Sequence, residues 1–287
     1  MILVTGATGL LGSTLVPWLK AQRKNVTTHA RSASGADHVA DLSGQAETFE
    51  LLDKVRPTVI INLVGLTNVD FCQEQLNQAY LFNTRTVENL TSWILQRESD
   101  CHLIQISTDQ VYDGVGLHKE GQVTLTNNYA FSKYAGEIAA KRVPSTILRT
   151  NFIGRSKVGS RVSLTDWLYT SLTGKQQIQV FSDVYFNPLT MTTLAEMILL
   201  VIEEKPLGVF NLGSRDGMNK ADFAFSFAEH LGLPQSAMAR VESSQAEFLK
   251  AYRPKDMRMD CSKFEHYFNI KLPSLLDQIK SVVKEYQ

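Results

Sequence analysis

A tyrosine and a lysine lie four positions apart near the middle of the sequence. In a helix, this spacing places the side chains of Tyr129 and Lys133 on the same face. A free phenol has a pKa of about 10 and is a slow acid at neutral pH unless its anion is stabilised. A neighbouring ammonium supplies that stabilisation. The pair therefore predicts a proton donor, Tyr129, that is supported by Lys133.

A threonine follows the strand-like run that precedes this pair. Residues His102 to Ile106 predict a strand, and Ser107-Thr108-Asp109 comes directly after it. Ligands of parallel sheets bind at the carboxyl ends of the strands. A hydroxyl at that edge can hold a carbonyl oxygen and stabilise the charge that develops when hydride arrives. Thr108, Tyr129 and Lys133 together predict the reduction of a carbonyl group.

Three glycines near the N-terminus are spaced three residues apart. Gly6, Gly9 and Gly12 lie between the apolar run Ile2-Leu3-Val4 and a helical pattern that begins at Leu10. The first glycine permits a tight turn, the second lets the backbone approach a pyrophosphate, and the third lets helix and strand pack closely. The helix N-terminus offers N–H groups to the anion. The expected contacts of a dinucleotide cofactor here are Gly6, Thr8, Gly9, Leu10, Leu11 and Gly12.

The second predicted strand ends without an acidic residue. An enzyme that selects NAD usually has a carboxylate there to bind the ribose 2′-hydroxyl, but this strand runs into His29-Ala30-Arg31-Ser32. The planar guanidinium of Arg31 is suited to a 2′-phosphate, and Ser32 offers a further donor. We therefore expect NADP(H) to be the preferred cofactor, with NADH also usable. A solvated loop arginine is the alternative interpretation of Arg31.

Strands and helices alternate regularly over the first half of the chain. Strand-like runs cover residues 2–4, 25–28, 58–62, 102–106 and 145–149, and helical spacing covers 10–22, 46–55, 80–95 and 128–141. Such alternation is typical of a parallel sheet with helices on both faces. The predicted fold class is α/β, a Rossmann-type doubly wound parallel sheet with a smaller mixed C-terminal lobe.

The alternation loosens after Thr150. Helices are expected over 164–172, 192–203 and 220–231, and strands over 179–181 and 209–212. We expect residues 1–150 to form the dinucleotide-binding domain, and residues 151–287 to form mainly a substrate-binding lobe, whose strands can return to the sheet. Because no long linker separates the two parts, the crevice between them is the expected ligand site.

The composition excludes several classes of function. Lys plus Arg and Asp plus Glu number 29 each, so no global field exists to hold a nucleic acid or an acidic membrane. The 3 cysteines and 6 histidines lack metal-ligand spacing, and no metal is expected. The sequence shows no signal peptide, and no apolar stretch reaches the about 18 residues of a membrane span. A cytoplasmic protein is expected.

These features resemble the extended short-chain dehydrogenase/reductases, and among them the dTDP-4-dehydrorhamnose reductase family. Beyond the glycine turn and the Thr108, Tyr129 and Lys133 set, the resemblance rests on motifs from end to end of the chain. They are Asp41-Leu42, residues 56–62, Thr67-Asn68-Val69-Asp70, Asn83-Thr84, residues 107–114, Leu148-Arg149-Thr150, Asn187-Pro188-Leu189-Thr190 and Arg253-Pro254. The resemblance implies the reduction of a nucleotide-activated 4-keto-6-deoxy sugar.

The resemblance also implies roles for single residues. Asp41 and Leu42 would lie beside the adenine, and Leu63, Val64 and Gly65 would line the nicotinamide ribose, whose hydroxyls Lys133 would bind. Substrate contacts are expected from Thr67, Asn68, Asp109, Gln110, Asn151 and Arg253. Arg253 would meet the diphosphate, with a structural salt bridge as the alternative. The chain departs from the family pattern at Leu63-Val64, Ala130 and Phe152, so the resemblance bears on the chemistry more than on the identity of the sugar.

Three other functions share parts of this pattern. A non-catalytic regulatory subunit similar to that of methionine adenosyltransferase retains the motifs, and a sugar-nucleotide epimerase shares the fold but holds NAD tightly. Related sugar 4,6-dehydratases carry Asp-Glu after the threonine, whereas this chain has Asp109-Gln110. A carboxamide cannot accept a proton as a carboxylate does, so the pair argues against a dehydratase. The nucleotide, the sugar and a homodimer are left open.

Overall fold

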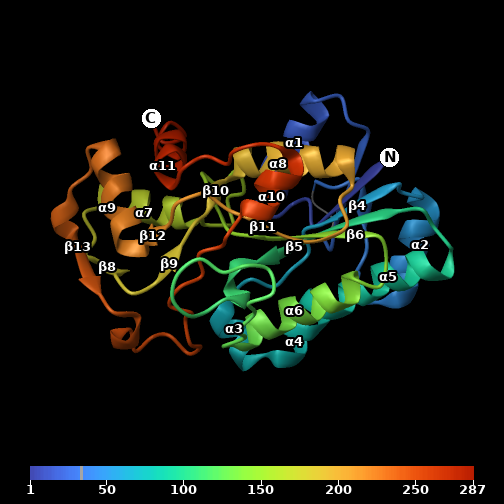
Figure 1. Ribbon diagram of the computed structural model, residues 1–287, viewed down its shortest axis with the longest axis horizontal. Helices are drawn as coiled ribbons and strands as arrows, with labels where there is room; N and C mark the ends of the chain where they lie inside the picture. Colours follow the sequence, from blue (N-terminus) through green and yellow to red (C-terminus); the bar gives the residue numbers. More distant parts are fainter. Residues whose placement is uncertain (33–34) are drawn as a thin grey trace. The chain divides into compact units, whose positions relative to one another are not determined.

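The main sheet is built from strands of the first half of the chain and one later strand. The computed structural model describes residues 1–32 and 35–287. Within these residues the sheet has seven strands in the order β11-β6-β5-β4-β1-β2-β3 (Figure 1). Their bounds are β1 Ile2–Thr5, β2 Val26–Ala30, β3 His38–Val39, β4 Val59–Asn62, β5 His102–Thr108, β6 Ser145–Thr150 and β11 Gly208–Leu212.

The order of the strands reverses at β1. This strand pairs in parallel with β2 on one side and with β4 on the other, and parallel ladders extend outward to β3 and to β5. Strands that leave a central strand in both directions are the mark of a doubly wound sheet, whose ligands bind at the point of reversal. The predicted fold class is confirmed.

Helices cover both faces of this sheet. They are α1 Gly12–Ala21, α2 Gln45–Val55, α3 Val69–Glu74, α4 Leu76–Tyr80, α5 Thr86–Gln96, α6 Asn128–Ala140 and α8 Met191–Glu204, with a π-helical turn over Leu81–Arg85 between α4 and α5. Leu52 of α2, Leu90 of α5 and Ala140 of α6 share one buried cluster with strand residues such as Ile60. Burying one large apolar side chain contributes about 1.5–3 kcal/mol. Figure 1 shows α1 and α8 on the opposite face.

The chain forms two compact units. The first unit comprises residues 1–108, 127–149 and 195–210, and the second unit comprises 109–126, 150–194 and 211–287. The sequence placed the boundary at residue 150 and allowed later strands to return to the sheet. In the structure β11 lies beside β6 in the main sheet, where pairing satisfies its backbone groups. The segment after β5, which the sequence assigned to the first domain, belongs to the second unit.

The second unit combines four helices with short paired strands among its described residues. The helices are α7 Leu164–Thr173, α9 Lys220–Leu231, α10 Ser262–Phe268 and α11 Leu275–Val283. The strand pairs are β7 Phe152–Ile153 with β10 Leu189–Thr190, β8 Ile178–Phe181 with β13 Met238–Val241, and β9 Tyr185–Phe186 with β12 Met218–Asn219. Single 3₁₀ turns cover Asp109–Val111, Gln235–Ala237 and Ser243–Gln245.

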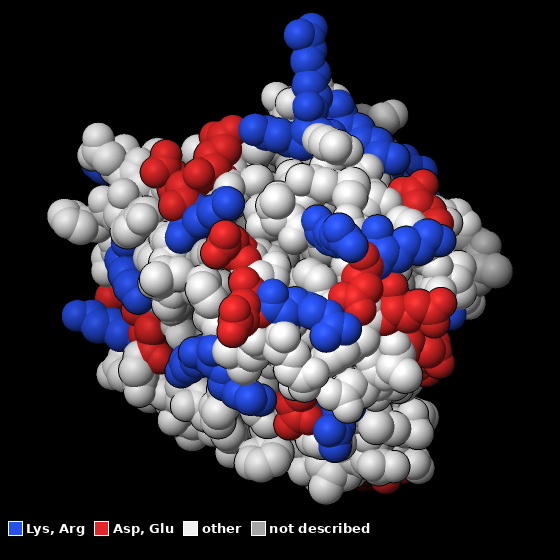
Figure 2. Space-filling view, turned by 90° about the vertical axis from the view of Figure 1, so that its right-hand side faces the viewer, with Lys and Arg blue, Asp and Glu red and all other residues white. Residues whose placement is uncertain are grey.

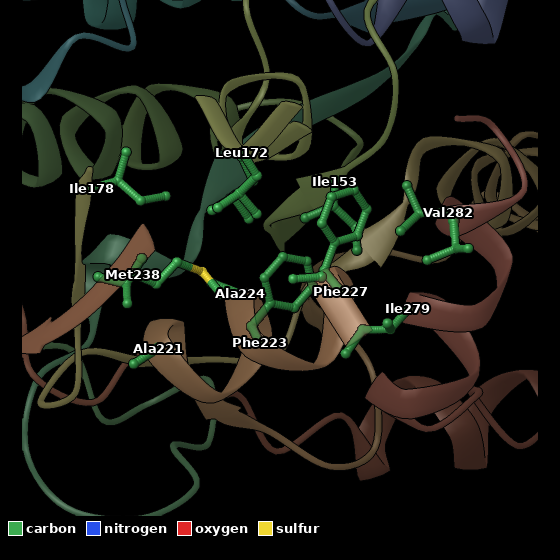
Figure 3. Packing of buried hydrophobic residues seen from close by; sticks show 14 of the residues in the cluster. Ile153, Leu172, Ile178, Ala221, Phe223, Ala224, Phe227, Met238, Ile279 and Val282 are labelled. Carbon is green, nitrogen blue, oxygen red and sulfur yellow. The ribbon is translucent and has the colours of Figure 1, made fainter. Parts of the chain in front are cut away.

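The core of the second unit forms around α9. Figure 3 shows Phe223 and Phe227 of this helix among side chains from α7 and α11, including Leu172 and Ile279. The buried positions of α9 recur at helical spacing, so one stripe of the helix faces the core. Asn219 caps its first turn and Gly232, with a φ of 65°, ends it.

The surface carries both signs of charge. On the face shown in Figure 2, Lys and Arg side chains are interspersed with Asp and Glu. Among the described residues, no helix is long and apolar enough to cross a membrane.

Candidate functional site

The glycine turn connects β1 to α1. Gly6 has a φ of 68°, in the region that favours glycine. At Gly12 a Cβ atom would lie 2.3 Å from the carbonyl oxygen of Ala7, so only glycine lets α1 begin this close to the turn. Leu11 precedes the helix, and its side chain makes no capping hydrogen bond in the part of the chain described. The N–H groups of Ser13 and Thr14 already donate to the carbonyl oxygens of Gly9 and Leu11, so an anion would be bound by the turn before them, at the positive end of the helix dipole.

A buried histidine supports this turn from β2. The backbone N–H of Ala7 donates to the carbonyl oxygen of His29 at 2.9 Å. The N–H of Gly6 donates to Nδ1 of the same residue at 3.5 Å, while Nε2 lies 2.9 Å from the carbonyl oxygen of Ala40. Burial lowers the pKa of His29, which favours the neutral ring. The turn is thus fixed against the end of β2, where Arg31 and Ser32 follow.

Arg31 is an exposed residue beside Asp41. Its guanidinium carbon lies 4.7 Å from the centroid of the Phe82 ring, a cation–π arrangement that orders the side chain. Burial acts to raise the pKa of Asp41, but hydrogen bonds from Ser43 and the charge of Arg31 outweigh it and hold the pKa below its usual value. Leu42, expected beside the adenine, is 3% exposed and belongs to the core cluster of the sheet. Ser32 and Thr8 are exposed.

The first turns of α6 carry Tyr129 and Lys133. Asn127 caps the helix by accepting a hydrogen bond from the N–H of Ala130 at 2.8 Å. Tyr129 and Lys133 are each 6% exposed. The Nζ of Lys133 donates to the carbonyl oxygen of Ile106 in β5 at 2.7 Å. The structure thereby brings the lysine to the strand that ends in the buried Thr108.

Lys133 is a charged group in a desolvated position. Burial lowers its pKa to about 8, and the charge of Glu137 acts in the opposite direction. An ammonium that is exposed to little water acts strongly on a neighbouring phenol. The helix thus carries Tyr129 and Lys133 four positions apart and buried, as the sequence predicted, and their roles as proton donor and stabilising cation stay predictions.

A chain of buried polar side chains, one hydroxyl and two amides, joins the strands β1, β4 and β5. Thr5 of β1 donates to Asn62 of β4 at 2.6 Å, and Asn62 donates to Gln105 of β5 at 2.7 Å. Gln105 in turn donates to the carbonyl oxygen of Ile106 at 3.1 Å, the same oxygen that accepts from Lys133. Fully satisfied buried networks of this kind rigidify their surroundings. The lysine is therefore positioned by strands β1, β4 and β5 together.

The segment after β4 is attached to α6 by Asn83. This amide donates to the carbonyl oxygen of Leu66 at 3.0 Å and to the hydroxyl of Ser132 at 2.9 Å, and it accepts from the N–H of Leu66 at 2.8 Å. A Cβ atom at Gly65 would lie 3.6 Å from the Nζ of Lys133, so this backbone runs beside the lysine. Leu63 and Val64 precede it and are partly buried.

Thr67 and Asn68 follow this segment. Both are exposed. Asn68 caps α3 by accepting a hydrogen bond from the N–H of Phe71 at 2.9 Å. A structural role therefore accounts for the side-chain oxygen of Asn68.

Three residues predicted to bind substrate and one further lysine lie near one another in the second unit. They are Asp109, Asn151, Arg253 and Lys220. Asp109 is 2% exposed and accepts a hydrogen bond from Asn151 at 2.6 Å. Lys220, at the start of α9, is close to the same carboxylate. Burial lowers the pKa of Lys220, the charge of Asp109 acts to raise it, and the charge of Arg253 lowers it further. The second unit thus brings two cations, a carboxylate and an amide together, while Gln110 beside them is half-buried.

Comparison with known families accounts for the whole chain. The model of the RmlD substrate binding domain family matches residues 1–287. The chain belongs to this family. The membership confirms the resemblance predicted from the motifs. Among the described residues of this RmlD-family chain, no group of three or more His, Cys, Asp or Glu side chains is arranged to hold a metal ion.

The RmlD-family relatives match over nearly the full length. The chain is 27% identical to the probable low-salt glycan biosynthesis reductase Agl14 of Haloferax volcanii, with 97% of this chain and 96% of the relative covered. It is 26% identical to the dTDP-4-dehydrorhamnose reductase of Escherichia coli K12, with 99% and 97% covered. A crystal structure of dTDP-4-dehydrorhamnose reductase from Bacillus anthracis in complex with NADP superposes with a TM-score of 0.89 at 21% identity, covering 99% of this chain and 98% of that one.

Two residues of this RmlD-family site were missed by sequence reasoning. Asn83 was quoted as part of a motif, but its bonds to Leu66 and Ser132 depend on a π-helical turn, which has no clear sequence signal. Lys220 carried no signal, because a lysine at the start of a helix is usually solvated. Its proximity to Asp109 follows from the fold of the second unit alone.

Proposed function

We propose that this chain is an NADP-dependent reductase of a nucleotide-activated 4-keto-6-deoxy sugar. The observation that carries the proposal is the buried Lys133, whose ammonium is held on the carbonyl oxygen of Ile106 at 2.7 Å. This bond places the lysine at the strand that ends in Thr108, on the same helix as Tyr129. The names of the relatives support the reaction class, since they include dTDP-4-dehydrorhamnose reductases and a dTDP-4-keto-6-deoxy-D-glucose reductase.

The glycine turn fits the pyrophosphate of a dinucleotide. Among the described residues, a Cβ atom at Gly9 would meet only the carbonyl oxygen of Gly6, at 3.2 Å, so its outer side is open for a close approach. Residues 6–12 and the start of α1 would hold the pyrophosphate, Arg31 and Ser32 the 2′-phosphate, and Asp41 the neighbourhood of the adenine. Leu63, Val64 and Gly65 would line the nicotinamide ribose, and Lys133 would bind its hydroxyls. The B. anthracis relative was solved with NADP.

The reaction adds a hydride to the keto carbon and a proton to its oxygen. NADPH, when bound, supplies the hydride. Thr108 donates a hydrogen bond to the carbonyl oxygen and stabilises the charge that grows on it. Tyr129 transfers its phenolic proton to the same oxygen, which yields the alcohol, and the ammonium of Lys133 stabilises the phenolate that is left. The proton that restores Tyr129 comes from solvent.

The resemblance to the reductase family assigns further polar residues to the sugar nucleotide. Asp109, Gln110 and Asn151 would contact the sugar, and Thr67 and Asn68 would lie along it. Arg253 and Lys220 would bind the diphosphate, because two neighbouring cations are suited to a group with two negative charges. Gln110 supplies no carboxylate base for an elimination, which favours reduction over dehydration at this site.

The assignment is tested with a panel of keto-sugar nucleotides. The purified chain is mixed with NADPH and with dTDP-, GDP- or UDP-linked 4-keto-6-deoxy sugars, and the loss of absorbance at about 340 nm is followed. We expect oxidation of NADPH with at least one of them. NADPH binding without any turnover would favour the regulatory subunit, and NAD that copurifies with the chain would favour the epimerase.

Two expectations from the sequence stay predictions. They are a homodimer, which analytical ultracentrifugation would detect, and a cytoplasmic location, which fractionation of the source cells would test.

A further inference from the structure

A buried ion pair lies behind the proposed catalytic lysine. Glu137 follows Lys133 by one helical turn on α6 and is 0% exposed, while Arg149 at the end of β6 is 1% exposed. The Nη2 of Arg149 lies 2.6 Å from Oε2 of Glu137, and its Nε lies 2.9 Å from Oε1. The pair is therefore bidentate, a geometry that fixes both side chains.

The same carboxylate also binds β5. The hydroxyl of Ser107 donates to Oε1 of Glu137 at 2.5 Å, and Ser107 is the residue directly before Thr108. One side chain thus joins three elements: the helix with Lys133, the strand with Thr108, and β6. The hydrogen bond from Lys133 to Ile106 is a second link between α6 and β5, one residue earlier in the strand.

Stability alone is a poor explanation for this arrangement. Removing two charges from water costs several kcal/mol for each ion, and well-packed apolar residues often replace a buried ion pair without loss of stability. Charged groups at such a position are therefore expected to serve another purpose. Glu137 lies one helical turn after Lys133. Its carboxylate can therefore act on the charge of the lysine.

Few charges act on the Lys133 ammonium. Burial lowers the pKa of Lys133 to about 8, and Glu137 and Cys72 are the described groups that oppose this shift. Burial raises the pKa of Cys72 on α3 to about 11, so the thiol carries no charge at neutral pH. Arg149, a cation like Lys133, is paired with Glu137. Tyr129 and Tyr134 are the further titratable groups of α6 near Lys133, and the guanidinium carbon of Arg149 lies 5.8 Å from the centroid of the Tyr134 ring. Glu137 is thus the carboxylate, among the described residues, whose charge acts to raise the pKa of Lys133.

We propose that Glu137 is a positioning residue for the reaction: it fixes α6 to the Thr108 end of β5 and provides the negative charge that keeps Lys133 protonated. The inference deepens the proposed function, since it assumes that Lys133 serves Tyr129. The experiments below use no sugar substrate, so they succeed or fail independently of which sugar is reduced.

The charge is tested by measuring the protonation of Lys133 directly. The full chain is labelled with ¹³Cε-lysine, and the Lys133 resonance, assigned by its absence in Lys133→Met, is titrated by NMR. Glu137→Gln keeps the shape of the side chain and an oxygen for Ser107 but removes the charge. We expect the pKa of Lys133 to fall by about one unit or more. Glu88 of α5 accepts a hydrogen bond from Tyr80. Glu88→Gln is the matched control and should leave the pKa of Lys133 unchanged.

A second variant guards against unfolding, because Glu137→Gln leaves Arg149 unpaired. Glu137→Gln combined with Arg149→Met removes both charges, and a fall of the Lys133 pKa smaller than in the single variant is expected. An unchanged pKa of Lys133 in folded Glu137→Gln, or in the folded double variant, would overturn the proposed charge role.

The positioning role is tested through Ser107. Ser107→Ala keeps the ion pair but breaks its connection to β5, so amide hydrogen exchange at residues 106–108 should become at least about tenfold faster, while the pKa of Lys133 stays unchanged. Ser107→Thr retains the hydroxyl and should restore slow exchange. Exchange in Ser107→Ala as slow as in the unmodified chain would contradict the connection between Glu137 and β5.

Discussion

The ammonium of Lys133 lies 2.7 Å from the carbonyl oxygen of Ile106. Because Ile106 is two residues before Thr108 in β5, this bond places a cation of α6 beside the strand end that carries the threonine. Gln105 donates to the same oxygen and extends the network to β4. The lysine is therefore held by the sheet itself.

Replacing Tyr129 with phenylalanine removes the proposed proton donor and leaves the ring in place. We expect kcat to fall by about 100-fold or more while NADPH binding stays nearly unchanged. Tyr134→Phe, one residue after Lys133 on the same helix, is the matched control and should retain activity. Stopped-flow measurement of NADPH oxidation gives kcat, and a fluorescence titration gives the dissociation constant of NADPH. Near-normal turnover in Tyr129→Phe would show that another group donates the proton.

Replacing Arg31 with alanine should erode the preference for NADPH over NADH. The guanidinium is exposed beside Asp41 and the ring of Phe82, where it can meet a 2′-phosphate, and a charge-assisted bond of this kind contributes about 1.5–3 kcal/mol. The dissociation constants of NADPH and NADH are compared by titration, with the exposed Arg240→Ala of the second unit as control. Equal affinities for the two cofactors in the unmodified chain would sink the assignment.

Two glycines of the turn should respond differently to alanine. Gly12→Ala places a Cβ atom 2.3 Å from the carbonyl oxygen of Ala7, so the chain should lose about 1–3 kcal/mol of stability and show a lower Tm. At Gly9 the corresponding contact is 3.2 Å, to the carbonyl oxygen of Gly6, which a small shift can relieve. Gly9→Ala should keep its Tm but bind NADPH at least about tenfold more weakly, because the methyl group blocks the pyrophosphate. Calorimetry and titration separate the two effects.

His102 should make the first unit sensitive to acid. Burial lowers its pKa to about 4 from its usual value of 6.5, and its Nε2 lies 2.8 Å from the hydroxyl of Thr146. That hydroxyl donates to the carbonyl oxygen of Pro206, so the neutral ring donates to Thr146.

The sign of this effect follows from linkage. In the unfolded chain His102 takes up a proton below pH 6.5, whereas in the folded chain it resists protonation until about pH 4. The free energy of unfolding therefore decreases as the pH falls through this window, by about 3 kcal/mol in total. His102→Gln keeps an N–H donor without titrating, and its unfolding free energy should vary less between these pH values. Urea unfolding at several pH values measures the difference, and identical pH profiles for the two proteins would refute it.

Local signals explain which elements were predictable from the sequence. The helix expected over 220–231 is found with the same bounds, since Asn219 and Gly232 mark its ends and its apolar residues recur at helical spacing. The helix expected over 80–95 is instead divided by a π-helical turn at Leu81–Arg85. Asn83 and Thr84 within this turn bond to the distant Leu66 and Ser132, and no local pattern encodes such contacts.

In the site, too, local features were predictable from the sequence and contacts between distant residues were not. The glycine turn and the Tyr129–Lys133 pair are spaced along a single element, so their geometry could be read from the sequence. Glu137 and Arg149, or Lys220 and Asp109, are brought together only by the fold. α11 escaped notice although Ser274 and Asp277 form a capping box at its start, and two-residue strands such as β7 and β9 exist only through their distant partners.

Deuterium transfer from labelled cofactor tests the central claim most directly. The chain is incubated with a 4-keto-6-deoxy sugar nucleotide and NADPH that carries deuterium at C4 of the nicotinamide, with each face labelled in turn. We predict that one of the two preparations delivers deuterium to C4 of the sugar, with one NADPH consumed for each product formed, and that Tyr129→Phe slows this transfer by about 100-fold or more. Release of water from a dTDP- or GDP-hexose without net consumption of cofactor would contradict the account.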